Sequence, residues 1–316
     1  MYLKIPCVTI LYLKIPCVNI LYFSIIYAKI NFNISEGEAG GEPPVKEKMK
    51  KAIKIAALAL ALVLLFACAA ACGGAGGKLA KIKKSGELVV FTDPNFYPFE
   101  FPGASGIEGV DIEIARAIAA DLGVKLTLQE SKFDAIIMSI KGGKGDIAVS
   151  GFTITDERKE SVDFSDPYIN SIQYMILMND SGLKVIEDLA GKRIGVAKGY
   201  TGSLLIDDEI NLEEGVLYGT GAEFTEYPSA MEATLDLQNG KVDAVIMDEY
   251  VAKSIAAVND KLKTFELAYA DGAVAAEEYG VVVPKGNADL LARINAVIAS
   301  LVSQNKIEEW VLKYSD

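Results

Sequence analysis

From Leu79 onward, short apolar runs of strand length alternate with amphipathic stretches of helical length. Residues 87–92 favour β-structure and predict a strand. Residues 110–122 carry apolar side chains at helical spacing, and Gly123 follows them, which predicts a helix that ends there. Thr155 is a candidate N-cap for a helix that begins at Asp156. The same reasoning predicts strands over 124–128, 146–149, 193–196, 223–227, 242–247 and 280–283, an extended piece over 168–178, and helices over 133–140, from 201 onward, and over 229–237, 249–258 and 288–304.

This order of elements predicts the α/β fold class. Strands that alternate with helices form mostly parallel sheets with helices on their faces. The pattern runs through two rounds of similar size, one before and one after the extended piece, and therefore predicts two lobes. In open sheets of this kind, ligands bind at the carboxyl ends of the strands. The residues that follow positions 92, 149, 196 and 247 are therefore the candidates for a binding site.

The residues at those strand ends suit a zwitterion, which carries one carboxylate and one ammonium group. Arg158 can hold a carboxylate through two parallel hydrogen bonds. Backbone amides at Gly151 and at the helix start 201–202 offer further donors. Asp248 can accept hydrogen bonds from an ammonium group. The structural alternatives are a surface ion pair for Arg158, a helix cap for Asp248 and a turn position for Asp93, which also follows a strand.

Composition excludes several kinds of chemistry. The sequence has no histidine, which removes the usual general base near neutral pH and the commonest metal ligand. Its four cysteines all lie in the first 72 residues, so the remainder has neither a disulfide framework nor a thiolate metal site. The net charge is +4 over residues 1–72 and −16 over the remainder, which would repel a nucleic-acid backbone. We expect no metal, no cofactor and no nucleic-acid partner.

Residues 49–72 have the features of an export signal. Three lysines precede an apolar run over 55–67, which is too short for a comfortable membrane span. The residues before Cys68 fit a lipoprotein signal. Those before Cys72 fit less well, but glycines follow Cys72 and would make a flexible tether, expected over 73–84. We favour Cys72 as the palmitate-bearing residue and keep Cys68, or an ordinary cleaved signal, as alternatives.

The 48 residues before this signal begin with a tandem repeat of period ten, YLKIPCVTI followed by YLKIPCVNI. Because an export signal belongs at an N-terminus, we expect translation to start at Met49 and residues 1–48 to be a misassigned or unstructured extension. A membrane hairpin is the alternative, and Pro6 and Pro16 disfavour it because they interrupt the apolar run. Peptides from residues 1–48 in the native protein would contradict the later start.

Several stretches of the sequence are distinctive. The most specific is SGFTITDERKESVDFSDP at 150–167, and the others are 92–101, GVDIE at 109–113, KGYTGS at 198–203, and GKVDA at 240–244 with Asp248. In these stretches the sequence resembles the periplasmic polar amino-acid-binding proteins of ABC transporters, solute-binding protein family 3, and the resemblance runs from about Leu88 to Lys313. It implies a two-lobed periplasmic-binding-protein fold of type II, with hinge strands at 168–171 and 273–279, lobe 1 over 85–169 plus 280–316, and lobe 2 over 173–273.

The resemblance also implies which residues hold the backbone of an amino acid. The α-carboxylate would be bound by Arg158, and the α-ammonium group by Asp248. Thr153 and the amides of Thr201 and Gly202 would help to hold the α-carboxylate, and the region of Ser150 and Gly151 would help to hold the α-ammonium group.

The ligand's side chain would lie between the rings of Phe96 and Phe133, again by resemblance. Asp93 would face its far end, with Lys198 or Tyr200 nearby. A carboxylate at that end favours a basic or amide side chain, such as that of arginine, lysine or glutamine, and repels an acidic one.

The function implied is capture of a free amino acid by a monomer that is lipid-anchored in the periplasm or on the outer face of the cell membrane, and its delivery to an ABC-transporter permease. The alternative is an enzyme on the same fold, such as a cyclohexadienyl-type dehydratase. We favour the binding protein because the acid partner Asp248 of the ammonium group is retained and no acid–base pair is evident. A receptor module is a third class, for which we expect no output domain.

Overall fold

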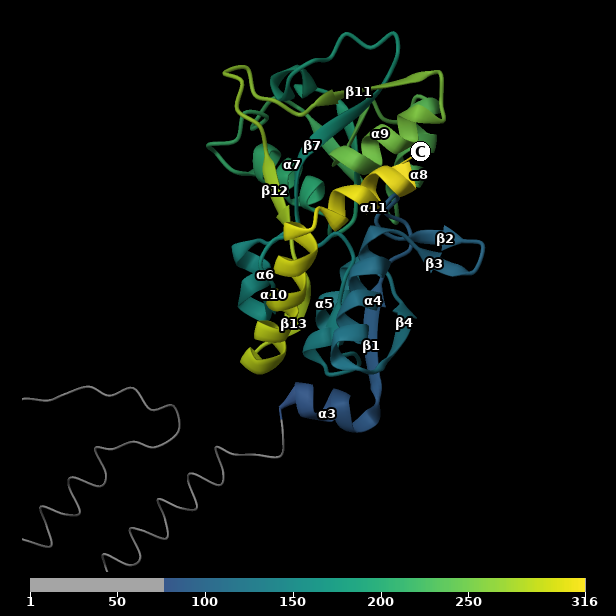
Figure 1. Cartoon of the computed structure of the whole chain (residues 1–316). Coiled ribbons are helices and arrows are strands. Elements are labelled where there is room, and N and C mark those ends of the chain that lie inside the picture. Colours follow the sequence, from purple (N-terminus) through teal and green to yellow (C-terminus); the bar gives the residue numbers. More distant parts are fainter. Residues whose placement is uncertain (1–76, 316) are drawn as a thin grey trace, which may run out of the picture. The chain divides into compact units, whose positions relative to one another are not determined.

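The computed structural model describes residues 77–315 (Figure 1). The export signal, both lipidation candidates and residues 1–48 lie outside this part. The described residues fold into two α/β lobes, each built on its own sheet. Within them, no helix is both long enough and apolar enough to cross a membrane.

Lobe 1 is built on a five-stranded sheet. Its strands are β1 (Glu87–Thr92), β4 (Lys125–Glu130), β5 (Ile147–Ala148), β6 (Val162–Phe164) and β13 (Val282–Pro284), in the spatial order β4-β1-β5-β13-β6. The strand β1 runs parallel to both of its neighbours, whereas β13, which arrives from the C-terminal part of the chain, is antiparallel to β5 and β6. The helices of this lobe are α4 (Val110–Leu122), α5 (Phe133–Lys141), α6 (Asp156–Ser161), α10 (Ala288–Ser303) and α11 (Lys306–Ser315) (Figure 1).

Lobe 2 has a mixed sheet in the order β11-β7-β10-β8-β9. Its strands are β7 (Ile169–Met178), β8 (Arg193–Ala197), β9 (Glu223–Tyr227), β10 (Ala244–Asp248) and β11 (Leu262–Glu266), and its helices are α7 (Thr201–Asn211), α8 (Ala230–Gln238), α9 (Glu249–Ala257) and the short 3₁₀ helix η1 (Ile186–Leu189). The strands β8, β9 and β10 are parallel, and β7 is antiparallel to β10 and β11.

Two antiparallel strands run between the lobes. The start of β7 pairs with β12 (Ala276–Tyr279), so that Tyr279 lies opposite Ile169 and Glu277 opposite Ser171. Thr153 of lobe 1 forms a further bridge with Tyr279. The start of β7 and the whole of β12 fall within the segments expected to be hinges, 168–171 and 273–279.

Local sequence signals account for most of these elements. The helix α4 spans the predicted residues and ends at Gly123, which adopts the left-handed conformation with φ of 69°. The Thr155 hydroxyl accepts a hydrogen bond from the backbone N–H of Arg158 and thereby caps α6. The hairpin of β2 (Phe101–Gly103) and β3 (Gly106–Glu108) and the strands β6 and β11 were not predicted, nor was helix α11.

A helix replaces the second half of the expected tether. Residues Lys78–Ser85 form α3, which ends at Gly86. Ile82 on this helix is buried in the lobe 1 core. The Lys78 ammonium also lies 2.9 Å from an oxygen of Asp146. The apolar contact and the ion pair hold this segment against lobe 1, so it is not a free linker.

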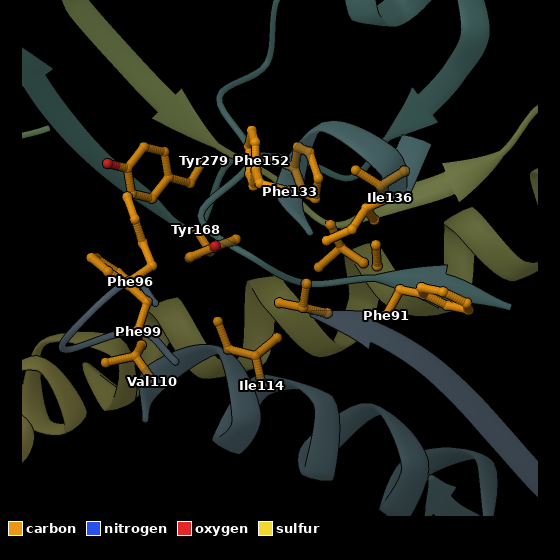
Figure 2. Packing of buried hydrophobic residues seen from close by; sticks show 14 of the residues in the cluster. Phe91, Phe96, Phe99, Val110, Ile114, Phe133, Ile136, Phe152, Tyr168 and Tyr279 are labelled. Carbon is orange, nitrogen blue, oxygen red and sulfur yellow. The ribbon is translucent and has the colours of Figure 1, made fainter. Parts of the chain in front are cut away.

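Aromatic side chains fill the core of lobe 1 up to the junction with lobe 2 (Figure 2). Tyr279 is fully buried, and its ring centroid lies 5.4 Å from that of Phe99 and 6.0 Å from that of Phe96. Figure 2 shows Phe133 and Phe152 side by side, and their rings stack at 4.4 Å. The rings support the loops that follow the strands of lobe 1.

Candidate functional site

Arg158 lies at the junction of the lobes and is only 7% exposed. Its Nη1 donates to the carbonyl of Thr153 at 2.8 Å, and its Nη2 donates to the carbonyl of Gly199 in lobe 2 at 3.0 Å. The guanidinium carbon lies 5.4 Å from the ring centroid of Phe133, in the range of a cation–π contact. The alternative of a surface ion pair is therefore wrong.

The electrostatics keep this buried cation charged. Burial lowers the pKa of Arg158, and the nearby Asp248 and Glu277 oppose that change. A guanidinium does not lose its proton under ordinary conditions. The junction thus contains a permanent positive charge with few polar partners of its own lobe.

Asp248 ends β10 and is 2% exposed. Its Oδ1 accepts from Nε2 of Gln173 at 2.8 Å, and its Oδ2 accepts from the Tyr279 hydroxyl at 2.5 Å. Its side chain makes no capping bond to the following helix α9, so the helix-cap alternative is wrong. Burial raises the pKa of this carboxyl group, against the lowering effect of the hydrogen bonds from Tyr279 and Gln173.

Glu277 is a site residue that sequence reasoning missed. It lies on β12, is 6% exposed, and has Asp248 as an acidic neighbour. Burial first, and then the charge of Asp248, raise its pKa to about 9. The alternation along β12 was an available signal, because Glu277 and Tyr279 stand two residues apart and share one face.

A second polar network lies under the loop that follows β5. Glu100 and Asp111 are both fully buried. The Ser150 hydroxyl donates to Glu100 at 2.7 Å, and the Gly151 N–H donates to Asp111 at 2.7 Å. The Gly151 amide is therefore not a free donor for a ligand, contrary to expectation, because a buried carboxylate takes its hydrogen bond.

The acids of this network also have perturbed ionisation. Burial raises the pKa of Asp111 to about 6, although the hydrogen bonds from Gly151 and Tyr168 lower it. Burial, and then the charge of Asp111, raise the pKa of Glu100 well above its usual range. The network fixes the turn at 150–151 from below.

Asp93 follows β1 and is 4% exposed. Its carboxylate accepts hydrogen bonds from the backbone N–H of Phe133 at 3.0 Å and from the Asn95 amide at 2.6 Å. Burial raises its pKa, and these two hydrogen bonds oppose the change. Each carboxylate oxygen can accept a second hydrogen bond, so the present partners leave capacity for a ligand.

The rings of Phe96 and Phe133 both contact the ring of Tyr200. Tyr200 stacks on Phe133 with centroids 4.0 Å apart, and its centroid lies 5.7 Å from that of Phe96. The Tyr200 ring, which belongs to lobe 2, therefore occupies the space between Phe96 and Phe133 in which the resemblance places the ligand's side chain. A cavity of about 190 Å³ lies next to it, lined in part by Phe133, Arg158 and Gly199.

The residues that begin α7 also face the junction. The Thr201 hydroxyl lies 3.4 Å from that of Thr153 and 3.4 Å from Nε2 of Gln173. A Cβ atom on Gly202 would lie 2.7 Å from Oε1 of Gln173, so a larger residue there would displace the Gln173 side chain. Lys198 does not lie among the buried acids of the junction. Its half-exposed side chain pairs with Asp134 of α5 at 3.5 Å.

The structure therefore brings most of the expected residues together from both lobes. Among residues 77–315, no group of three or more acidic, histidine or cysteine side chains is arranged to hold a metal ion.

Comparison with known proteins identifies the family. The model of the bacterial extracellular solute-binding proteins, family 3, matches residues 88–316. The chain belongs to this family. The two-lobed α/β fold expected for a periplasmic binding protein is confirmed by its likeness to solved members.

Three similar proteins have names that state what they bind. The L-cystine-binding protein TcyJ of Escherichia coli is 32% identical, with 73% of this chain and 84% of the relative covered. The glutamine-binding protein GlnH of Bacillus subtilis is 31% identical, with 75% and 84% covered. The structure of AbpA from Streptococcus pneumoniae bound to L-arginine is 31% identical, with 75% and 97% covered and a TM-score of 0.67. All three members of this family are binding proteins, and none has an enzyme's name.

Proposed function

We propose that this family 3 protein binds a free polar amino acid outside the cytoplasm and delivers it to an ABC importer. One observation carries the proposal. A buried guanidinium, Arg158, and a buried acid, Asp248, meet at the junction of two lobes. A guanidinium matches a carboxylate through two parallel hydrogen bonds, and a carboxylate attracts an ammonium group. The pair suits both charged groups of an amino acid backbone.

The ligand class follows from Asp93 and from the relatives. Asp93 is buried near the rings of Phe96 and Phe133 and favours a basic or amide group at the end of the ligand's side chain. Similar proteins are named for arginine, glutamine and cystine. We propose arginine, lysine or glutamine as ligands of this protein, and we expect glutamate to bind more weakly because two carboxylates repel.

Ligand capture would work by closure of the lobes. Arg158 belongs to lobe 1 and Asp248 to lobe 2, so one ligand contacts both. Contacts that exist only in the closed arrangement shift the population toward it. A permease would then recognise the surface of the closed form.

A lipid anchor would keep the protein close to its permease at the membrane. We propose lipidation of Cys72, with Cys68 as the alternative, after removal of the export signal. Mass spectrometry of the N-terminal peptide tests this directly, because a lipidated cysteine would be its first residue. An unmodified N-terminus beyond residue 72 would contradict the anchor.

A thermal-shift screen against the twenty amino acids tests the proposed function. A specific ligand stabilises the folded protein by mass action, so we expect a raised melting temperature with arginine, lysine or glutamine. No shift with any amino acid would refute the proposal. Turnover of a cyclic acid substrate would favour the enzyme alternative, for which no relative described above provides support.

A further inference from the structure

Glu277 belongs neither to the sequence motifs that indicated the binding site nor to the residues proposed above to bind the ligand. Its strand β12 runs between the lobes, where Glu277 pairs with Ser171 of β7 and is buried. The side chains of Asp248, Thr201 and Gln173 lie close enough to its carboxyl group to affect its pKa. Its Oε2 atom is buried and has no hydrogen-bond partner among the described residues.

The charges around Glu277 are unbalanced. The titratable groups that face it are Asp248 on β10, Arg158 on α6 and Tyr279 on its own strand. Two adjacent buried acids do not both ionise readily. The pKa of Glu277 is raised to about 9, so near neutral pH this carboxyl group keeps its proton beside Asp248.

An ammonium group needs more acceptors than Asp248 alone provides. It carries three N–H donors. Each oxygen of Asp248 already accepts one hydrogen bond, from Gln173 and from Tyr279. Two further buried oxygens near Asp248 have no partner among the described residues, Oε1 of Gln173 and Oε2 of Glu277, and only that of Glu277 belongs to an acid.

We propose that Glu277 is a second carboxylate acceptor for the ligand's α-ammonium group, and that it releases its proton to solvent when the amino acid binds. The inference rests on the proposed function. The O–H bond of the Glu277 carboxyl group breaks, and the proton passes to water or buffer. An N–H of the ammonium group then takes the place of that proton between Glu277 and Asp248. No electrons are transferred.

Isothermal titration calorimetry measures this proton directly. Wild-type protein is titrated with L-arginine, and separately with L-glutamine, at pH 7 in phosphate and in Tris, which differ in their enthalpy of ionisation. We expect the apparent binding enthalpy to differ between the buffers by an amount that corresponds to about one proton released per ligand, the proton that Glu277 holds. Equal enthalpies in the two buffers would overturn the inference.

Two variants assign the proton to its source. Glu277→Gln should still bind, with about tenfold lower affinity because a neutral hydrogen bond replaces a charge-assisted one, and should release no proton. Glu278→Gln alters the exposed neighbour on the opposite face of β12 and should match the wild type. Proton release that persists in Glu277→Gln would assign it to another group and contradict the inference.

A measurement on the wild type decides the matter even if the Glu277→Gln variant does not fold. Carbon-13 NMR of the Glu277 carboxyl carbon should show the protonated form at pH 7 without ligand and the ionised form with L-arginine bound. An unchanged signal on binding would overturn the inference. If no amino acid binds in any of these experiments, the proposed function fails instead, so the two failures are distinguishable.

Discussion

The molecule contains two buried acid pairs that look alike in composition but differ in surroundings. Glu100 and Asp111 lie in lobe 1, and Asp248 and Glu277 lie at the junction of the lobes. In each pair one carboxylate oxygen has no hydrogen-bond partner among the described residues, Oε2 of Glu100 and Oε2 of Glu277. Burial is the largest cause of the raised pKa in both pairs. These shared properties therefore do not tell a structural pair from a binding pair.

The surroundings make the distinction. The pair of Glu100 and Asp111 receives its hydrogen bonds from Ser150, Gly151 and Tyr168, and no cation is among the main causes of its raised pKa values. Asp248 and Glu277 face Arg158 across the junction. We conclude that the first pair positions a loop, and that the second pair, together with its cation, forms the proposed binding site.

The largest expected effect comes from Arg158. Arg158→Ala should weaken amino-acid binding by roughly 100-fold or more, because a buried charge-assisted contact is lost. Calorimetry with L-arginine measures it. Arg193→Ala is the matched control, since Arg193 forms an exposed pair with Asp243 at 2.7 Å and should leave affinity unchanged. If the Arg158→Ala variant binds with near-wild-type affinity, the presence of Arg158 does not make the acid pair at the junction a binding site.

The pH dependence of stability sharpens the comparison. The pKa of Glu277 rises from 4.5 to about 9 on folding, so the folded protein binds more protons than the unfolded chain between these values. Its contribution to stability is complete below about pH 4.5 and is lost as the pH rises toward 9. The free energy of unfolding should fall in this range by at most about 1.4 kcal/mol per pH unit for one proton.

Denaturant titrations from pH 5 to pH 9 test this dependence. Glu277→Gln should flatten the upper part of the curve. Asp111, whose pKa is about 6, acts only in the lower part. The variant Glu278→Gln should retain the wild-type slope. A slope unchanged in Glu277→Gln would mean that this residue does not hold the proton.

Removal of the Asp111 carboxylate, which belongs to the acid pair in lobe 1, should mainly lower the stability of the protein. Asp111→Ala leaves the buried N–H of Gly151 without a partner, which should lower the free energy of unfolding by about 1–3 kcal/mol. Binding should weaken less than in Arg158→Ala. Asp121→Ala, which disrupts an exposed pair with Arg293, is the control and should change stability by no more than about 0.5 kcal/mol. Loss of binding without loss of stability in Asp111→Ala would place that acid in the binding site.

The smallest expected effect concerns Tyr200. Its ring contacts Phe96 and Phe133, in the space assigned to the ligand's side chain. Tyr200→Thr removes this aromatic contact and should raise the affinity for L-arginine by up to about tenfold. Tyr200→Phe keeps the ring and should not. Weaker binding in Tyr200→Thr would mean that the ring forms a wall of the site rather than competing with the ligand.

Local patterns predicted the elements whose signals are local. The helix at 110–122 and the strands at 87–92 and 223–227 match the structure, because periodicity and flanking turns determine them. The strand β11 was missed because it is short and pairs with β7, which lies far earlier in the chain. Helix α3 was interpreted as part of a tether because glycines precede it in the sequence. The sequence does not show that Ile82 is buried in lobe 1 or that Lys78 pairs with Asp146.

The residues of the candidate site also differ in whether local sequence or only the tertiary fold reveals them. Arg158 and Asp248 were predicted because each follows a recognisable strand end. Glu277 was missed because its importance depends on Asp248 and Arg158, which only the tertiary fold brings near it. The Gly151 amide was assigned to the ligand because the sequence does not show that Asp111, forty residues earlier, accepts its hydrogen bond.

A crystal structure of the protein with L-arginine tests the central claim most directly. We expect the α-carboxylate to lie on the guanidinium of Arg158 and the α-ammonium group to contact Asp248 and Glu277. The guanidinium of the ligand should extend toward Asp93, with the ring of Tyr200 displaced from Phe133. An amino acid bound elsewhere, or one whose ammonium group does not contact Asp248, would contradict this account of the site.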